Sequence, residues 1–259
     1  MATTKITLIC LPFAGGSSSA YEPLAEVLGD FVQLASVELP GRSRRFDEAP
    51  LDTAEQMVEE IWRQIQHLLF RPYAFLGHSM GALLAYLLCH KIRQSGSPAP
   101  AHVFFSGREA PSSPPDESPE YLLPFADFKA KLASYGGIPD EILHDEAVFA
   151  FFEPMIRADF RAVQTWEYRP RPPLHVAATV LSGLQDELTE TEVYDWQRAF
   201  GQPIQFEFFE GGHFFLFEQR AAVAEMLLRH LRARHFQNQS SHSIKNPFSD
   251  GSEKIIAQR

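Results

Sequence analysis

Three side chains of the types used in nucleophilic catalysis occur along this chain in the order serine, aspartate, histidine. Ser79 lies in the pentapeptide GHSMG at positions 77–81, Asp186 follows the segment 183–185, and His213 follows a glycine pair. A serine hydroxyl is a weak nucleophile at neutral pH, so it needs a nearby base and a third group that orients the base. We therefore predict a catalytic triad in which Ser79 attacks, His213 takes its proton and Asp186 orients and stabilises the imidazolium.

The pentapeptide around Ser79 has the G-x-S-x-G spacing of a nucleophile elbow. A serine on a sharp strand-to-helix turn needs neighbours without side chains two residues away on each side, and Gly77 and Gly81 supply them. The run 73–76 is typical of a strand and the run 82–88 of a helix. Because the positive end of that helix points at the serine, we expect the N–H of Met80 to be one oxyanion donor.

A second oxyanion donor should come from the loop after the first strand, because two N–H groups must converge on the oxyanion from different elements. That loop reads PFAGGSSS at positions 12–19. We predict the N–H of Ala14, with Phe13 as the alternative. The glycines at 15 and 16 are also typical of a phosphate-binding loop, but no Lys-Ser/Thr pair follows them, which argues against a nucleotide-binding P-loop.

The acid of the triad has alternatives. Asp186 follows a strand pattern, which places it at the C-terminal edge of the predicted sheet, where ligands bind in open α/β folds. An aspartate after a strand is also a common helix N-cap, and Thr189 and Glu190 close by keep that interpretation open. Asp195 is the reserve candidate, although it falls inside a predicted helix.

The base is predicted from its position. His213 follows a strand pattern and two glycines that permit a tight turn, and the apolar run 214–217 anchors it. His78, directly beside the serine, is a weaker candidate.

Strand-like and helix-like segments alternate along most of the chain. Strand patterns occupy 5–11, 31–39, 73–76, 101–106, 176–181 and 204–209, and helical patterns occupy 21–28, 53–69, 82–88, 189–200 and 220–234. This alternation predicts the fold class α/β, with a mostly parallel central sheet and helices on both faces.

The alternation breaks between about 110 and 169, where a proline-rich stretch leads into helical segments without a strand pattern. We interpret this region as an inserted helical lid. Apolar side chains recur in it at helical spacing, at Phe149, Phe152, Ile156, Phe160 and Val163. That face either packs down on the core or lines an acyl pocket, and the two interpretations are compatible because a lid has two sides.

Length and charge limit the classes of function. With 259 residues and 45% apolar side chains, we expect one catalytic domain over 1–236 and a polar, mostly disordered tail over 237–259. The net charge of -10 argues against nucleic acid and anionic membranes as partners. A basic cluster of Arg42, Arg44 and Arg45 is expected to be a solvated loop, or else to make local contacts with an acidic partner.

The cysteines and the N-terminus indicate a compartment. Cys10 and Cys89 lack the spacing of a metal or redox motif, and we expect buried free thiols. There is no signal-peptide pattern, and no stretch approaches the ~20 apolar residues that span a bilayer. We expect a soluble cytoplasmic monomer that needs no cofactor and no metal.

Five motifs together resemble those of the external, or type II, thioesterases. They are LPFAGGS at 11–17, ELPGR at 38–42, GHSMG at 77–81, GGIP at 136–139 and GGHFF at 211–215, and the match runs from about residue 5 to 232. The resemblance implies an α/β-hydrolase fold and hydrolysis of acyl groups from the phosphopantetheine arm of acyl or peptidyl carrier proteins. Members of this family serve polyketide, nonribosomal peptide and fatty acid synthesis, commonly by removing aberrant or stalled acyl units.

By the same resemblance, Ser79, Asp186 and His213 are the triad, Met80 and Ala14 are the oxyanion donors, and 110–169 is a mobile lid over the acyl channel. The candidate substrate-binding residues are Phe13, Phe149, Phe152 and Phe214. Alternatives remain open: medium-chain acyl release in fatty acid synthesis, an esterase or acyltransferase that uses the same serine, and a non-catalytic carrier-binding module on the hydrolase fold.

Overall fold

A parallel sheet forms the centre of the molecule. The computed structural model describes residues 5–114 and 118–243, and within them the strand order is β2-β1-β3-β4-β5-β6, with every neighbouring pair parallel. The strands are β1 (Ile6–Leu11), β2 (Val32–Ser36), β3 (Tyr73–His78), β4 (His102–Ser106), β5 (Ala178–Gly183) and β6 (Gln205–Phe209). The predicted α/β class and parallel sheet are confirmed.

The register brings the functional loops to one edge of this sheet. Leu11 at the end of β1 lies opposite Gly77 of β3, and His78 lies opposite Ser106 at the end of β4. Because parallel strands end at the same edge, the loops after β1, β3, β4, β5 and β6 all open at their C-terminal ends. The strands β1, β3, β4 and β5 are buried along their whole length, as expected when helices cover both faces of a parallel sheet.

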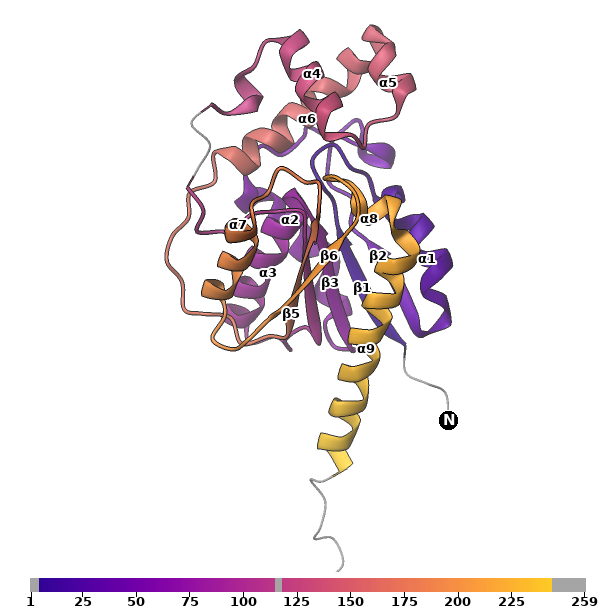
Figure 1. The fold of residues 1–259 in the computed structure, drawn as a ribbon, viewed down its shortest axis with the longest axis vertical. Helices are drawn as coiled ribbons and strands as arrows, with labels where there is room; N and C mark the ends of the chain where they lie inside the picture. Colours follow the sequence, from indigo (N-terminus) through magenta and orange to yellow (C-terminus); the bar gives the residue numbers. More distant parts are fainter. Residues whose placement is uncertain (1–4, 115–117, 244–259) are drawn as a thin grey trace, which may run out of the picture.

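Helices cover both faces of the sheet (Figure 1). On one face, α2 (Ala54–Ile65), α3 (Met80–Ser95) and the short α7 (Glu190–Tyr194) contribute to one apolar core. On the other face, α1 (Glu22–Leu28), α8 (Phe215–Glu218) and α9 (Arg220–Ser243) contribute to a second. The predicted apolar positions of α2, Met57, Ile61 and Ile65, are buried, and the Thr53 hydroxyl caps that helix by accepting from the Gln56 N–H.

Several helix boundaries differ from the sequence-based expectation. The helix expected over 53–69 ends at Ile65 and is followed by a 3-10 turn, Gln66–Leu68, and the one expected over 82–88 spans Met80–Ser95. The helix predicted over 189–200 is divided into α7 and a 3-10 segment, Asp195–Ala199. The last helix, predicted to end at 234, continues to Ser243, so the first seven positions of the expected polar tail extend α9. The rest of that expected tail, 244–259, lies outside the described residues.

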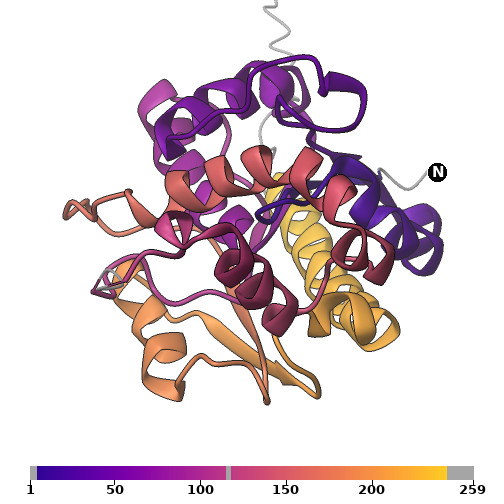
Figure 2. The ribbon, with the colours of Figure 1, turned by 90° about the horizontal axis from the view of Figure 1, so that it is seen from above.

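The chain segment that connects β4 to β5 forms a group of helices, which lies over the C-terminal edge of the sheet (Figures 1 and 2). It contains α4 (Phe125–Tyr135), α5 (Asp140–His144) and α6 (Glu146–Gln164), preceded by a 3-10 turn at Glu120–Leu122. We call this group the lid. The lid has its own apolar core, which includes Phe128, Leu132, Phe149, Met155 and Ile156.

Both cysteines are buried free thiols, as predicted. Burial raises the pKa of the Cys89 thiol to about 12 and that of Cys10 further still, so both stay protonated at neutral pH. Across the described ranges, the helices fall short of the length and apolar character needed to cross a bilayer.

Candidate active site

Ser79 occupies a strained turn between β3 and α3. Its backbone has φ 54° and ψ −116°, a combination that a residue with a side chain rarely adopts, and its N–H donates to the Ser106 carbonyl over 2.8 Å. A Cβ atom on Gly77 would lie 2.1 Å from the Gly81 carbonyl oxygen, and one on Gly81 would lie 2.5 Å from the Leu11 carbonyl oxygen. The G-x-S-x-G spacing therefore has the steric cause that the sequence indicates.

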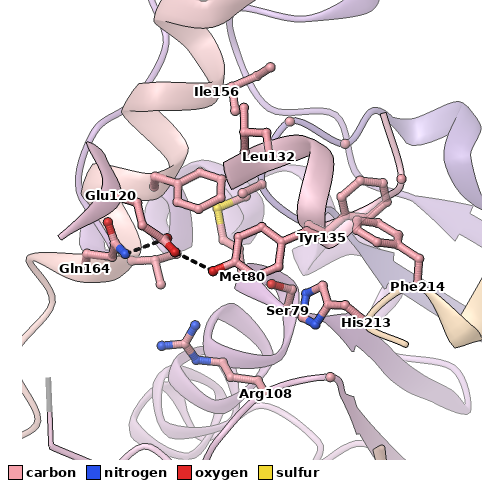
Figure 3. Close-up of a pocket in the computed structure, with 18 of the residues that line it drawn as sticks. Ser79, Met80, Arg108, Glu120, Leu132, Tyr135, Ile156, Gln164, His213 and Phe214 are labelled. Carbon is pink, nitrogen blue, oxygen red and sulfur yellow. Dashed lines mark hydrogen bonds between the residues drawn. The ribbon is translucent and has the colours of Figure 1, made fainter. Parts of the chain in front are cut away.

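His213 and Asp186 form a pair beside this turn. The Nδ1 atom of His213 lies 3.2 and 3.1 Å from the two carboxylate oxygens of Asp186, and the Asp186 side chain is 4% exposed. The Glu187 N–H also donates to this carboxylate, over 2.8 Å. With Nδ1–H donating to Asp186, the neutral imidazole has Nε2 available as an acceptor, and Figure 3 shows the Ser79 side chain next to the His213 ring.

The structure separates Asp186 from its alternatives. Thr189, not Asp186, is the N-cap of α7, where its hydroxyl and the Glu192 side chain form a capping box. Asp195 forms an exposed ion pair with Arg198 over 2.9 Å. Among the described contacts, Asp186 is hydrogen-bonded to a histidine and Asp195 is not.

His78 is buried in the protein interior next to His213. Its ring is fully buried, with Nδ1 3.0 Å from the Ser106 hydroxyl and the ring centroid 5.0 Å from that of His213. Burial, together with the nearby His213, holds the pKa of His78 well below its usual value. A histidine that stays neutral and buried in this way suits packing rather than proton transfer.

The two predicted oxyanion donors line the same cavity as Ser79. Met80 is the first residue of α3, where an N–H has no partner within the helix. In the loop after β1, the Gly16 N–H donates to the Phe13 carbonyl over 2.8 Å and the Gly15 N–H donates to Asp159 over 2.8 Å. Gly15 and Gly16 are therefore engaged within the protein, whereas no described hydrogen bond uses the N–H of Phe13 or Ala14, so either is available to an oxyanion.

The cavity lies between the sheet edge and the lid and has a volume of about 1430 Å³. Its lid wall is largely apolar and includes Leu132, Ile138, Phe152, Ile156, Phe160 and Val163. Of the predicted substrate-binding residues, Phe13, Phe152 and Phe214 line it. Phe149 does not: its ring is fully buried in the lid core, 5.3 Å from the ring of Phe125.

A polar network in the cavity wall was not predicted. The Tyr135 hydroxyl donates to the Glu120 carboxylate, whose second oxygen accepts from Gln164 Nε2 over 2.9 Å (Figure 3). The Lys131 ammonium lies 4.4 Å from the Tyr135 ring centroid and 3.7 Å from Glu120. No sequence signal identifies these residues, because Glu120 and Gln164 are 44 positions apart and meet only when α6 packs beside the turn at 120–122.

The lid reaches the core next to the candidate base. The glycine pair of the GGIP motif lies over Phe214, and a Cβ atom on Gly137 would lie 2.3 Å from the Cζ atom of that ring. The motif therefore permits a close approach between lid and core.

One expectation for the basic cluster is wrong. Arg42 is 2% exposed and pairs with Asp159 inside the protein, so it is neither in a solvated loop nor available to a partner. Arg45 pairs with Glu48 and Glu60, while Arg44 is exposed.

A thioesterase domain family model matches residues 6–232. The gramicidin S biosynthesis protein GrsT of Aneurinibacillus migulanus is 34% identical over 89% of this chain and 91% of its own length, and thioesterase PikA5 of Streptomyces venezuelae is 32% identical over 88% and 82%. The type II thioesterase BorB from the borrelidin biosynthetic cluster superposes with a TM-score of 0.81, at 34% identity, over 88% of this chain and 93% of BorB.

Proposed function

This chain belongs to the thioesterase family, and we propose that it is a type II thioesterase that cleaves acyl thioesters from the phosphopantetheine arm of carrier proteins. The observation that carries the proposal is the strained Ser79 turn beside the His213–Asp186 pair, at the floor of a cavity with an apolar lid wall. A module that only binds a carrier has no need of a strained serine beside an oriented histidine.

In the proposed reaction, the Ser79 oxygen attacks the thioester carbonyl carbon while its proton moves to Nε2 of His213. The N–H groups of Met80 and Ala14 hold the resulting oxyanion, and one such donor is typically worth 10²–10³ in kcat. Collapse of this intermediate breaks the carbon–sulfur bond, and His213 returns the proton to the leaving thiolate. The Asp186 carboxylate stabilises the imidazolium throughout.

Water completes the cycle. A water molecule gives a proton to His213 and attacks the acyl-enzyme carbonyl, and the second oxyanion collapses to release a carboxylic acid. The proton on His213 returns to the Ser79 oxygen, so the enzyme is regenerated without a cofactor. The apolar lid wall, with Phe152 and Ile156, suits an acyl chain, and a cavity of about 1430 Å³ exceeds the range of most small-ligand sites.

We infer that the carrier belongs to a polyketide or nonribosomal peptide assembly line, where this activity removes aberrant or stalled acyl units. The support comes from relatives that cover nearly the whole chain: by their names, GrsT serves gramicidin S biosynthesis and BorB comes from the borrelidin cluster. Two buried free thiols suit the reducing cytoplasm where such synthesis occurs. A monomer suffices, because one chain supplies the triad, both donors and the lid.

Substrate comparison tests the proposal. Carrier-bound acyl thioesters from acetyl upward are compared with oxygen esters of the same acyl groups, with water or an alcohol as the acceptor. We expect the carrier thioesters to be hydrolysed with the higher kcat/KM and water to be the acceptor. A preference for oxygen esters would indicate an esterase, transfer to the alcohol would indicate an acyltransferase, and either result would overturn the proposal.

A further inference from the structure

A buried ion pair joins the lid to the loop after β2. Arg42 donates from Nη1 to Asp159 Oδ2 over 2.8 Å and from Nη2 to Oδ1 over 2.7 Å. The two side chains are 2% and 0% exposed. Asp159 belongs to α6, the long helix of the lid, whereas Arg42 belongs to the body of the domain.

The same two side chains hold the turn that carries Ala14. The Gly15 N–H donates to Asp159 Oδ2 over 2.8 Å, and Arg42 Nη1 donates to the Gly16 carbonyl over 3.1 Å. The turn is closed by the bond from the Gly16 N–H to the Phe13 carbonyl, and Gly15 has φ +78°, as the third position of a type II turn requires. Ala14 therefore precedes two residues whose backbone is fixed by the ion pair.

Packing also ties α6 to this turn. A Cβ atom on Gly15 would lie 3.2 Å from Cγ1 of Ile156, one turn before Asp159 on the same helix. Stability alone is a weak reason for a buried ion pair, since removing two charges from water costs about as much as their attraction returns. The two extra hydrogen bonds to the turn give the pair a different role, because they determine where the neighbouring N–H groups point.

We propose that Asp159 and Arg42 are positioning residues for the proposed reaction. They fix the turn 13–16 so that the Ala14 N–H points at the position of the oxyanion, and α6 is thereby a fixed part of the oxyanion hole. Lid opening then involves α4 and α5 and not α6, because displacement of α6 would pull Asp159 away from the Gly15 N–H. This inference rests on the proposed function and deepens it.

The test is the substitution Asp159→Asn, which keeps the size of the side chain and removes its charge. Since the oxyanion forms only during the reaction, we expect kcat to fall about 10- to 100-fold with KM changed by less than about threefold. The rate at which a fluorophosphonate labels Ser79 should fall in the same proportion, because the phosphoryl oxygen uses the same donors.

A matched control is available on the same helix. Arg161 of α6 pairs with Asp52 of the body over 2.8 Å, but this pair is exposed and lies outside the turn 13–16. Asp52→Asn therefore removes a lid-to-body ion pair without touching the turn, and both kcat and the labelling rate should stay within about twofold of the unsubstituted protein.

A second variant keeps the test decisive if Asp159→Asn does not fold, as judged by circular dichroism. Arg42→Lys retains a cation beside Asp159 but cannot reproduce the forked contact and the Gly16 bond together, so it should show the same split between kcat and KM. A folded variant with unchanged kcat and labelling rate, or with KM alone altered, would overturn the inference. Labelling of Ser79 needs no thioester, so the two proposals can fail separately. If the unsubstituted protein does not hydrolyse carrier thioesters, but Asp159→Asn still lowers the labelling rate, only the proposed function is refuted.

Discussion

The ring of Tyr135, at the end of lid helix α4, lies beside the ring of His213, with 5.5 Å between the centroids and 44° between the ring planes. A lid side chain thus contacts the candidate base directly. The hydrogen bond from Tyr135 to Glu120 fixes that ring, and Gln164 in turn holds Glu120. These lid residues therefore bound the space next to Ser79.

Substitution of Tyr135 should change the acyl preference. Tyr135→Leu removes the ring from the space next to Ser79, so we expect the ratio of kcat/KM for octanoyl over acetyl carrier thioesters to rise about tenfold. Tyr135→Phe is the matched control, because it keeps the ring and removes only the hydroxyl. If Tyr135→Leu leaves that ratio unchanged, Tyr135 does not limit the acyl pocket.

Loss of the nucleophile should abolish turnover. For Ser79→Ala we expect kcat for a carrier-bound acyl thioester to fall about 10⁴- to 10⁶-fold, as when a triad member is removed elsewhere. The fold should persist, because alanine differs from serine only in lacking the hydroxyl group and therefore needs no additional space. Near-normal hydrolysis by the folded variant, measured as thiol release, would show that another residue attacks.

The strain at Ser79 should appear as a stability difference between two inactive variants. Ser79→Ala keeps a side chain at φ 54°, whereas Ser79→Gly relieves the strain at the cost of a more flexible unfolded chain. We expect the glycine variant to have the larger free energy of unfolding, by about 1 kcal/mol. Urea denaturation measures this, and equal midpoints would show that the turn stores no strain.

Contact between lid and core should depend on Gly137. A methyl group there would collide with the Phe214 ring, so Gly137→Ala should displace the loop 136–139 and lower kcat/KM about tenfold or more. Gly136→Ala is the control: its φ of +78° is almost the same as the +79° of Gly137, but its Cβ would lie 4.0 Å from that ring. Equal losses in the two variants would point to backbone strain instead of the contact with Phe214.

Acid should destabilise the fold partly through His90. Burial, followed by the charges of Arg171 and Arg93, lowers the pKa of His90 from 6.5 to about 4. Below pH 6.5 the unfolded chain binds a proton that the folded chain does not, so stability falls with pH until the folded pKa is reached, by up to about 1.4 kcal/mol per pH unit. His90→Gln should make the unfolding free energy less steep between pH 6.5 and 4. An unchanged slope would rule out this contribution.

Local rules within the sequence determined the framework. The glycines of the Ser79 elbow are required because side chains at 77 and 81 would clash, mostly with residues within four positions in the chain; the approach of Gly81 to Leu11 is the exception. Periodic apolar residues identified the six strands and the helices packed on them. Because the strands are parallel and each functional loop follows one of them, the convergence of Ser79, Asp186 and His213 at one sheet edge followed from the order of elements alone.

Only the tertiary structure decided which lid residues face the cavity and which polar groups meet. Phe149 and Phe152 share one helix and one apolar pattern, yet the first lies in the lid core and the second lines the cavity. Arg42 was expected at the surface and is instead paired with Asp159, 117 positions away. The physical reason is that hydrophobic periodicity and steric clashes act between near neighbours in the chain, whereas buried pairs depend on how segments far apart in the sequence pack against each other.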